Sequence, residues 1–183
     1  KVRYMLDKES KVGYIKLTNF DEDTADEFEQ ALERLEEKDM KGLVLDLRNN
    51  PGGLLNIAHD IANKFIDKGL IVSTRPRFGI PSYLSATKAG THPDYPLVVL
   101  INQNSASASE IVAGALGDPK HGRAVLVGER SHGKGSVQTI VGHPGGGAQL
   151  KYTMAYYHLP SGQKVKSRDA TKKKGKEDWG VAP

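Results

Sequence analysis

Three serines, Ser105, Ser107 and Ser109, alternate with alanines where the most apolar run, residues 97–101, passes into a helical pattern. A serine at such a junction can act as a nucleophile, because the N-terminus of a helix stabilises negative charge that develops there. The spacing from Ser107 to Glu110 is equally typical of a capping box, which requires no chemistry. On the local sequence alone capping is the better interpretation, and nothing decides which serine would react.

A second candidate for chemistry is Lys134, which stands between two glycines. The surrounding residues 128–136 nearly match the phosphate-loop pattern G-x-x-x-x-G-K-[S/T], but Gly135 replaces the hydroxyl residue that binds magnesium. Residues 137–141 alternate like a strand, whereas a phosphate loop must open a helix. A nucleotide site is therefore disfavoured. The remaining interpretations are an exposed loop lysine and a general base, whose neutral form would need desolvation in a closed cleft.

The third candidate is the glycine turn in residues 46–53 (DLRNNPGG), which ends one apolar run and precedes a helical pattern. Glycines at such a turn let backbone amides approach a ligand closely. Pro51 has no N–H, so Gly52 and Gly53 are the candidate donors. Taken alone, the segment is more simply interpreted as a tight turn with a helix start.

Composition excludes several other kinds of chemistry. The chain has 183 residues and no cysteine, which excludes disulfides, thiolate nucleophiles and cysteine-based metal sites. The six histidines form no metal-binding spacing, although a histidine could still serve as a general base from a distant position. No apolar run approaches the roughly 20 residues of a membrane helix, so no integral membrane segment is expected.

The formal net charge of +4 is concentrated in residues 164–178, where seven cations accompany three anions. A nucleic-acid-binding protein usually spreads basic residues along a face and interleaves aromatic ones, and this segment does not. No nucleic-acid partner is therefore expected. The segment is best interpreted as a solvated loop, with a patch for an acidic partner as the alternative.

These candidates must be positioned by the surrounding secondary structure. Two short strands are expected within residues 1–20 and a helix from Thr24, with Thr24 and Glu27 as a capping box and Gly42 as its stop. The expected elements that follow are a strand at 43–47, a helix at 54–65, a strand at 70–74, a long surface loop at 75–96, a strand at 97–101, a helix at 108–116 and a strand at 124–127.

From Val137 onward the pattern predicts strands only, around residues 152–158 and 163–166, separated by glycine-rich turns. Alternating strands and helices require crossover connections, so the fold class is α/β with a largely parallel sheet and an added C-terminal β-hairpin. Residues 1–183 are expected to form one domain. The abrupt end at Pro183 suggests a fragment of a longer protein.

Together these segments resemble the catalytic core of the C-terminal processing peptidases, or tail-specific proteases, which are serine peptidases of the ClpP/crotonase-like fold. The resemblance covers nearly the whole chain, and the joint order of its motifs is highly specific although each motif alone is weak. The motifs are residues 46–54 (DLRNNPGGL), 105–110 (SASASE), 128–138 (GERSHGKGSVQ), 157–162 (YHLPSG) and 180–183 (GVAP).

The resemblance implies a role for each matching residue. Ser107 matches the family's nucleophile, Lys134 its general base, and Gln138 the residue that orients the base. The oxyanion hole implied by the family uses the amide of Ala108 and one from the glycine turn, Gly52 or Gly53. No metal or cofactor is implied.

The resemblance also implies a setting outside the cytoplasm, in the periplasm, cell envelope or plastid lumen, with C-terminal regions of polypeptides as substrates. Two departures are noted: no PDZ domain is expected within these 183 residues, and His132 precedes the glycine–lysine–glycine motif where relatives tend to have an aromatic residue. The alternative function is a non-catalytic ligand-binding module of the same fold, similar to the retinoid-binding repeats of the photoreceptor matrix. Such modules need not keep Ser107, Lys134 and Gln138 together.

Overall fold

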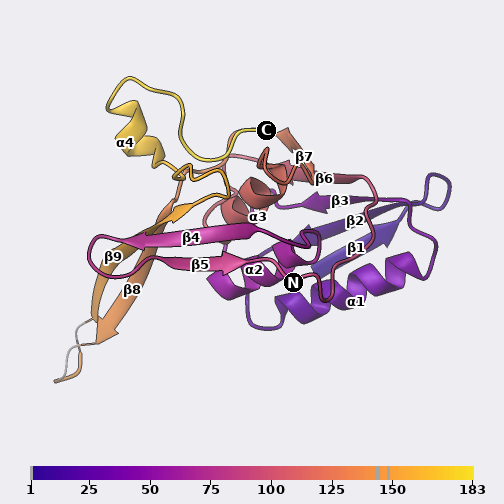
Figure 1. The fold of residues 1–183 in the computed structure, drawn as a ribbon, viewed down its shortest axis with the longest axis horizontal. Helices are drawn as coiled ribbons and strands as arrows, with labels where there is room; N and C mark the ends of the chain where they lie inside the picture. Colours follow the sequence, from indigo (N-terminus) through magenta and orange to yellow (C-terminus); the bar gives the residue numbers. More distant parts are fainter. Residues whose placement is uncertain (1, 143–144, 148) are drawn as a thin grey trace.

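The computed structural model describes residues 2–142, 145–147 and 149–183, which build two β-sheets with helices between and beside them (Figure 1). The strands of the first sheet are β1 (Val2–Leu6), β2 (Val12–Leu17), β3 (Gly42–Asp46), β6 (Leu97–Ile101) and β7 (Val125–Gly128). They lie in the order β1-β2-β3-β6-β7. Strand β1 is antiparallel to β2, and the other three pairs are parallel. The prediction of a largely parallel sheet is confirmed.

The helices that connect the parallel strands are α1 (Thr24–Glu36), α2 (Leu55–Asn63) and α3 (Ala108–Gly117). Because β2, β3, β6 and β7 follow one another in one direction across the sheet, right-handed crossovers place the three helices on the same face. The contacts of α2 with both α1 and α3 agree with this arrangement. Every residue of α3 except Gly117 is buried, so this helix runs through the core.

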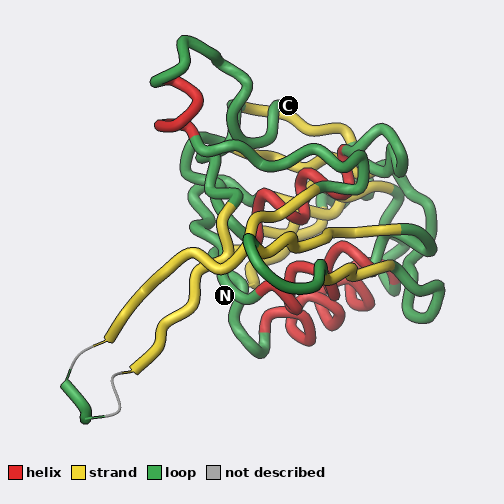
Figure 2. The backbone as a smooth tube through the Cα atoms, turned by 60° about the vertical axis from the view of Figure 1, so that its left-hand side comes forward, coloured by secondary structure: helices red, strands yellow, loops and turns green. Residues whose placement is uncertain are grey.

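The second sheet is antiparallel and consists of β4 (Leu70–Pro76), β5 (Ser82–Ser85), β8 (Ser136–Gly142) and β9 (Gln149–His158), in the order β5-β4-β9-β8. Strand β4 contacts both α2 and α3, so these two helices lie between the sheets. The β8–β9 hairpin projects away from the body of the molecule in both views (Figures 1 and 2). The expected hairpin is thus present, as one half of a sheet.

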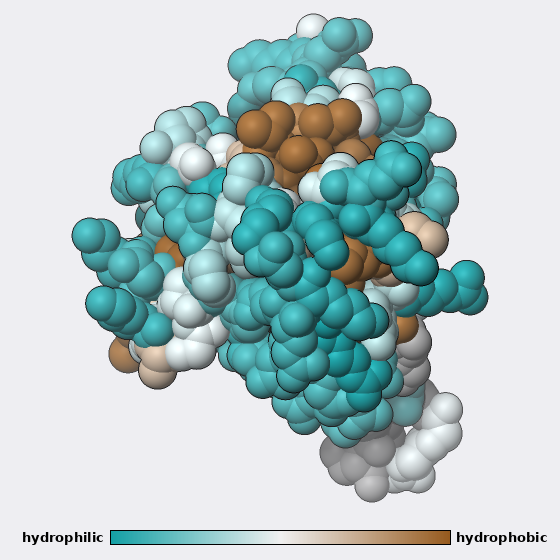
Figure 3. Space-filling model, turned by 90° about the vertical axis from the view of Figure 1, so that its right-hand side faces the viewer, coloured by the Kyte–Doolittle hydropathy of each residue, from teal (hydrophilic) through white to brown (hydrophobic). Residues whose placement is uncertain are grey.

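Apolar side chains from both layers form one core. Leu45 and Val99 from the central strands β3 and β6, and Ile111 from α3, are fully buried. Tyr157 of β9 belongs to the same cluster, which ties the second sheet to the first. Figure 3 shows a largely hydrophilic face with an apolar patch near its top, at the level of edge strand β7. The exposed apolar side chains of β7 are Val125 and Val127.

Two expectations about the first helix were wrong. Thr24 is the first helical residue and not the cap, which is Asp23, and the Glu27 carboxylate accepts a hydrogen bond from Val2 N instead of closing a capping box. The helix ends at Glu36, well before Gly42, because Asp39 takes the left-handed conformation (φ 65°) that a glycine was expected to supply. Gly42 instead begins β3.

Three further differences concern short elements. The expected loop at residues 75–96 contains the end of β4 and the whole of β5, whose short polar sequence gives little strand signal. The expected strand at residues 163–166 is reduced to one bridge between His158 and Lys164. The last part of the chain is not strands only, because a helix, α4 (Arg168–Lys172), forms in the lysine-rich segment.

Candidate active site

Two of the three candidate segments, the glycine turn and the segment with the three serines, lie at one edge of the first sheet. Strands β3 and β6 are parallel neighbours, so the turns that follow their carboxyl ends lie side by side. The Asn50 carbonyl in the first turn accepts a hydrogen bond from Ala106 N at 3.0 Å in the second. The Asn50 side chain donates to Leu17 O at 2.9 Å and accepts from Gly52 N at 2.9 Å, which fixes the glycine turn against β2.

The structure distinguishes the three serines. Ser105 Oγ donates to Leu47 O at 2.8 Å and Ser109 Oγ donates to Asn50 O at 3.0 Å, and both residues are 0% exposed. These two hydroxyls therefore hold the turns together. Ser107 is 9% exposed and is the N-cap of the buried helix α3. Only Ser107 combines some solvent access with a position at the helix N-terminus.

The backbone of Ser107 is strained. Its φ of 55° and ψ of −113° lie in a region that residues with a side chain seldom occupy. Such a conformation persists only where the surrounding structure enforces it, and it is enriched at functional sites. Ser107 also forms a capping box with Glu110, so the capping expectation holds beside any chemical role.

The glycine turn packs directly against Ser107. At Gly52 (φ 99°) an added Cβ would lie 2.7 Å from Ser107 Cβ and 2.8 Å from Ala108 N, so only glycine fits there. The Gly52 amide already donates to Asn50 Oδ1. Within the described part of the chain, the amides of Gly53 and Ala108 donate to no protein acceptor. Of the two glycines, Gly53 thus has the amide that is available to a ligand.

Glu110 links the turn that carries Ser107 to residues 131–135, which we call the lysine loop. The sequence did not indicate this role. This buried carboxylate accepts from Ser107 N at 2.9 Å and from Lys134 N at 2.8 Å through Oε2. Its Oε1 accepts from Ser131 Oγ at 2.6 Å and from Gly133 N at 2.7 Å. Four hydrogen bonds to one carboxylate set the position of residues 131–134 relative to Ser107.

Lys134 is held through its backbone, while the residue itself is exposed. Its neighbouring glycines pack against another segment: a Cβ on Gly133 would lie 2.8 Å from Lys166 O, and one on Gly135 only 1.7 Å from Val165 O. The glycines therefore allow close backbone contact, and Lys134 is exposed instead of being desolvated in a closed cleft as expected. Among the described residues, no recorded contact joins the Lys134 ammonium to Ser107.

Gln138 lies on β8, opposite Thr153 of β9 and next to a β-bulge. Gln138 is exposed. In the described part of the chain its amide makes no recorded contact with Lys134. The structure therefore places Ser107, Ala108 and the two glycines together and brings the Lys134 backbone to the same carboxylate, whereas Gln138 stands apart on the second sheet.

Tyr157 is a second residue whose role sequence reasoning missed, although it begins one of the quoted motifs. It is 5% exposed, and its phenol hydrogen-bonds with the Ser107 side chain. Burial raises the pKa of the Tyr157 phenol, and the hydrogen bond with Ser107 only partly offsets this effect. Its backbone N–H donates to Gly135 O at 2.9 Å, directly beside Lys134. Tyr157 therefore touches both the serine and the lysine loop.

Asp46, at the end of β3, anchors the start of the glycine turn. This fully buried carboxylate accepts from Tyr14 Oη at 2.6 Å, from Arg48 Nη2 at 2.8 Å and from Arg48 N at 2.9 Å, and Lys16 Nζ lies 3.5 Å away. Burial disfavours the charged form, but the hydrogen bonds from Arg48 and Tyr14 outweigh it and lower the pKa of Asp46 well below its ordinary value.

None of the described histidines is placed at Ser107, and several contact other residues. His121 Nε2 lies 2.7 Å from Leu70 O, and His59 contacts Asp60 and Ser85. His132 is exposed, and His143 lies outside the described residues. No recorded contact joins any described histidine ring to Ser107.

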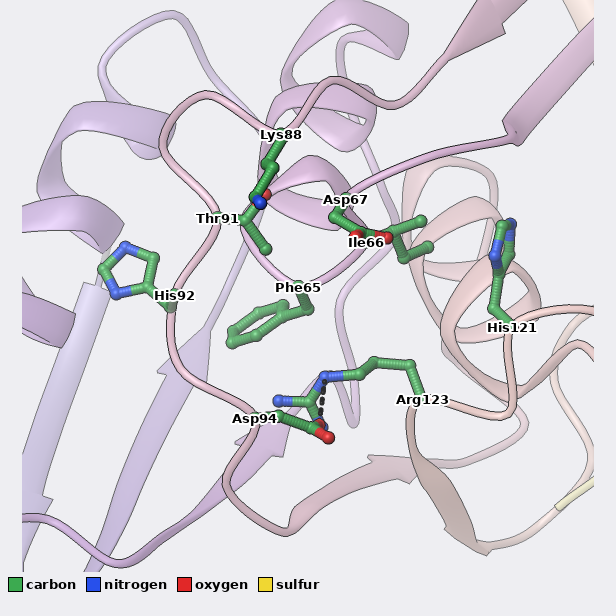
Figure 4. Close-up of a pocket in the computed structure, with 9 residues that line it drawn as sticks. All are labelled: Phe65, Ile66, Asp67, Lys88, Thr91, His92, Asp94, His121 and Arg123. Atoms are coloured by element: carbon green, nitrogen blue, oxygen red, sulfur yellow. Dashed lines mark ion pairs between the residues drawn. The ribbon is translucent and has the colours of Figure 1, made fainter.

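A separate cavity of about 420 Å³ lies among the residues shown in Figure 4. Three of its ionisable groups are already partnered: Arg123 pairs with Asp94 at 3.4 Å, and His92 lies 2.7 Å from Glu36 and 3.1 Å from Glu29. None of its lining residues belongs to the serine segment, the glycine turn or the lysine loop. This cavity is therefore not the candidate site.

No group of three or more His, Asp or Glu side chains in the described part of the chain could hold a metal ion. Across residues 2–142, 145–147 and 149–183, no helix is both long and apolar enough to span a bilayer.

Comparisons with solved structures define the class of protein. Over its full length the chain superposes on a photosystem II D1 C-terminal processing protease with a TM-score of 0.79 and 33% sequence identity, covering 47% of that chain. The chain is thus an α/β protein with the fold of a processing protease of known structure. More particularly, the chain belongs to peptidase family S41, whose family model matches residues 11–173.

Curated relatives are named as carboxy-terminal processing proteases. The chain is 46% identical over 162 residues to a carboxy-terminal-processing protease of Bartonella bacilliformis, covering 86% of this chain and 37% of the relative. It is 40% identical over 157 residues to the carboxy-terminal processing protease CtpA of Bacillus subtilis, covering 85% of this chain and 33% of the relative. The chain therefore spans about a third of the length of these relatives.

Proposed function

We propose that this chain is the core of a serine endopeptidase that cleaves polypeptides in or near their C-terminal regions. Ser107 is the nucleophile, Lys134 the general base and Gln138 the residue that orients the base. Residues 1–183 act as one catalytic domain. The observation that carries the proposal is the setting of Ser107: a strained, partly accessible serine at a helix N-terminus, beside amides that face no protein acceptor.

In the proposed reaction Lys134 Nζ takes the proton from Ser107 Oγ, and the oxygen attacks a peptide carbonyl. The negative charge that develops on the carbonyl oxygen is stabilised by the amides of Ala108 and the glycine turn. Gly53 is the better donor of the two glycines, because Gly52 N already bonds Asn50 Oδ1. Collapse of the tetrahedral intermediate breaks the peptide C–N bond, and Lys134 Nζ returns its proton to the departing amine. Water then hydrolyses the acyl-enzyme left on Ser107.

The proton transfer needs a neutral lysine, and desolvation favours that form. Lys134 is exposed in this structure. We therefore infer that the bound substrate covers Lys134 and brings its ammonium group to Ser107. Glu110 supports this step because it already holds the Lys134 amide and the Ser107 amide on one carboxylate oxygen.

The substrates and the cellular location are part of the same proposal, and the relatives support them. Relatives include a chloroplastic carboxyl-terminal-processing peptidase of Arabidopsis thaliana as well as bacterial processing proteases. We infer an extracytoplasmic or plastid location and polypeptide substrates.

Single substitutions assayed on an unstructured peptide test this proposal. Ser107→Ala should abolish hydrolysis, because the nucleophile and its base act as a unit. Ser105→Ala and Ser109→Ala are the matched controls, and they should retain activity if circular dichroism shows that they fold. Lys134→Arg should be nearly inactive, because a guanidinium does not lose its proton at working pH. Full activity of folded Ser107→Ala or Lys134→Arg would refute the dyad.

A further inference from the structure

A second cavity, of about 500 Å³, is lined in part by the lysine loop. Its walls come from the lysine loop, from β8 and β9, and from the segment that contains α4. The residues that line it are His132, Gly133, Lys134, Gly135, Ser136, Tyr156, Lys164, Val165, Lys166, Ser167, Ala170, Thr171, Lys174, Lys176 and Asp178. This basic cavity adjoins the proposed active site, because Lys134 belongs to both.

The charge of the basic cavity is strongly one-sided. Five of its lining residues are lysines, and Asp178 is its only Asp or Glu side chain. Asp178 is already paired with Lys166. The other four lysines have no ion-pair partner among the described residues. Like charges that share one cavity repel each other, so an anionic ligand would lower the electrostatic energy of this arrangement.

Contacts among the lining residues hold the walls of the basic cavity in place. The ammonium of Lys164 lies 3.2 Å from the centre of the Tyr156 ring, a cation–π contact, and burial lowers the pKa of this lysine. Gly133 and Gly135 bring the lysine loop against the backbone of residues 165–168. On the opposite wall, Thr171 of α4 is 6% exposed. The hydroxyls of Ser136 and Ser167 add polar groups to the cavity.

We propose that the basic cavity binds a carboxylate of the polypeptide substrate close to the scissile bond. The inference rests on the proposed function: Lys134 lines the cavity and its amide shares Glu110 Oε2 with the Ser107 amide, so a ligand bound there would be a part of the substrate. The carboxylate comes either from an acidic side chain or from the C-terminus of the substrate. A carboxylate there pairs with Lys164 and Lys174, and its peptide covers Lys134.

Binding can be separated from hydrolysis by working with the Ser107→Ala variant of the whole chain. Its affinity is measured by fluorescence anisotropy for three labelled peptides: one with a glutamate near its C-terminus, one with glutamine in its place, and one with an amidated C-terminus. We expect at least one of the two neutralised peptides to bind about tenfold more weakly, the value of one charge-assisted hydrogen bond. The neutralised peptide whose binding becomes weaker identifies the source of the carboxylate.

A pair of matched double variants tests the site itself. Lys164→Gln with Lys174→Gln removes two cations from the basic cavity, whereas Lys68→Gln with Lys173→Gln removes two exposed lysines outside it. The first pair should weaken binding of the acidic peptide about tenfold, and the second should change it less than twofold. Circular dichroism checks that both fold.

Equal binding of all three peptides, or equal losses in the two double variants, would overturn the basic cavity as a carboxylate site. Because these measurements use a variant without the nucleophile, they do not depend on hydrolysis. Carboxylate binding without peptidase activity in the wild-type chain would count against the proposed function alone.

Discussion

Among single residues, Tyr157 offers the sharpest test of how the site is assembled. Its phenol hydrogen-bonds with Ser107, and its backbone N–H bonds Gly135 beside Lys134. Tyr157→Phe keeps the ring and the backbone bond but removes the hydroxyl. We expect kcat to fall about fivefold with KM nearly unchanged, since one hydrogen bond is worth about 1 kcal/mol.

Tyr152→Phe, on an exposed position of the same strand, is the control for Tyr157→Phe and should have wild-type kinetics. A Tyr157→Phe enzyme with unchanged kcat at every pH would show that the phenol has no part in orienting Ser107.

Glu110 illustrates what sequence reasoning can and cannot supply for a site. The spacing from Ser107 to Glu110 predicted a capping box, and that box is present. The bonds from Glu110 to Ser131, Gly133 and Lys134 cross between segments more than 20 residues apart. No local pattern encodes such contacts, because they depend on how the helix packs against the loop.

At the scale of elements, Glu110 joins α3 to the lysine loop. Glu110→Gln replaces one acceptor oxygen by an NH₂ group that faces N–H donors, so at least one buried donor loses its partner. Each unsatisfied donor costs about 1–3 kcal/mol. We expect a lower free energy of unfolding in urea, together with reduced turnover. Glu29→Gln, an exchange of the same kind on α1 and away from the site, should leave turnover unchanged.

Asp46 connects the end of β3 to β2 and gives the fold a pH dependence of known sign. Its pKa is lowered in the folded state, so the ionised carboxylate stabilises the fold above the unfolded value of about 3.9. This contribution is lost as the pH falls below about 4. Asp46→Asn should therefore unfold more easily at pH 7 by about 2 kcal/mol, the size of one charged hydrogen bond.

Denaturation in urea at several pH values measures this effect of Asp46. The difference in free energy of unfolding between Asp46→Asn and wild type should narrow as the pH falls below 4. A gap that stays constant down to pH 2 would mean that the charge of Asp46 does not stabilise the fold.

The elements that sequence predicted well are those whose burial leaves a strong pattern. Strands β3 and β6 are mostly apolar runs in which no residue is exposed, and α1 shows the period of a half-buried helix. The short strand β5 and the short helix α4 escaped prediction because they are largely exposed and polar. Their formation depends on neighbouring backbone rather than on their own composition.

For the whole molecule, the proposed site residues are divided between the two sheets. Ser107 and the glycine turn follow strands of the first sheet, whereas Gln138 and Tyr157 lie on strands of the second. The motifs name the residues of the site, and that assignment stays a prediction. They could not predict that Lys134 would be exposed and apart from Gln138, since side-chain placement depends on the packing of one layer on the other.

The positive φ of Ser107 lowers thermal stability at a residue that we propose is needed for turnover. Glycine adopts positive φ without strain, and at an N-cap it costs only a few tenths of a kcal/mol relative to serine. Ser107→Gly should therefore melt at a higher temperature than wild type, and Ser107→Ala, which keeps the strain and loses the cap, at a lower one. If calorimetry gives that order, the chain gives up robustness at this position in order to keep a hydroxyl there.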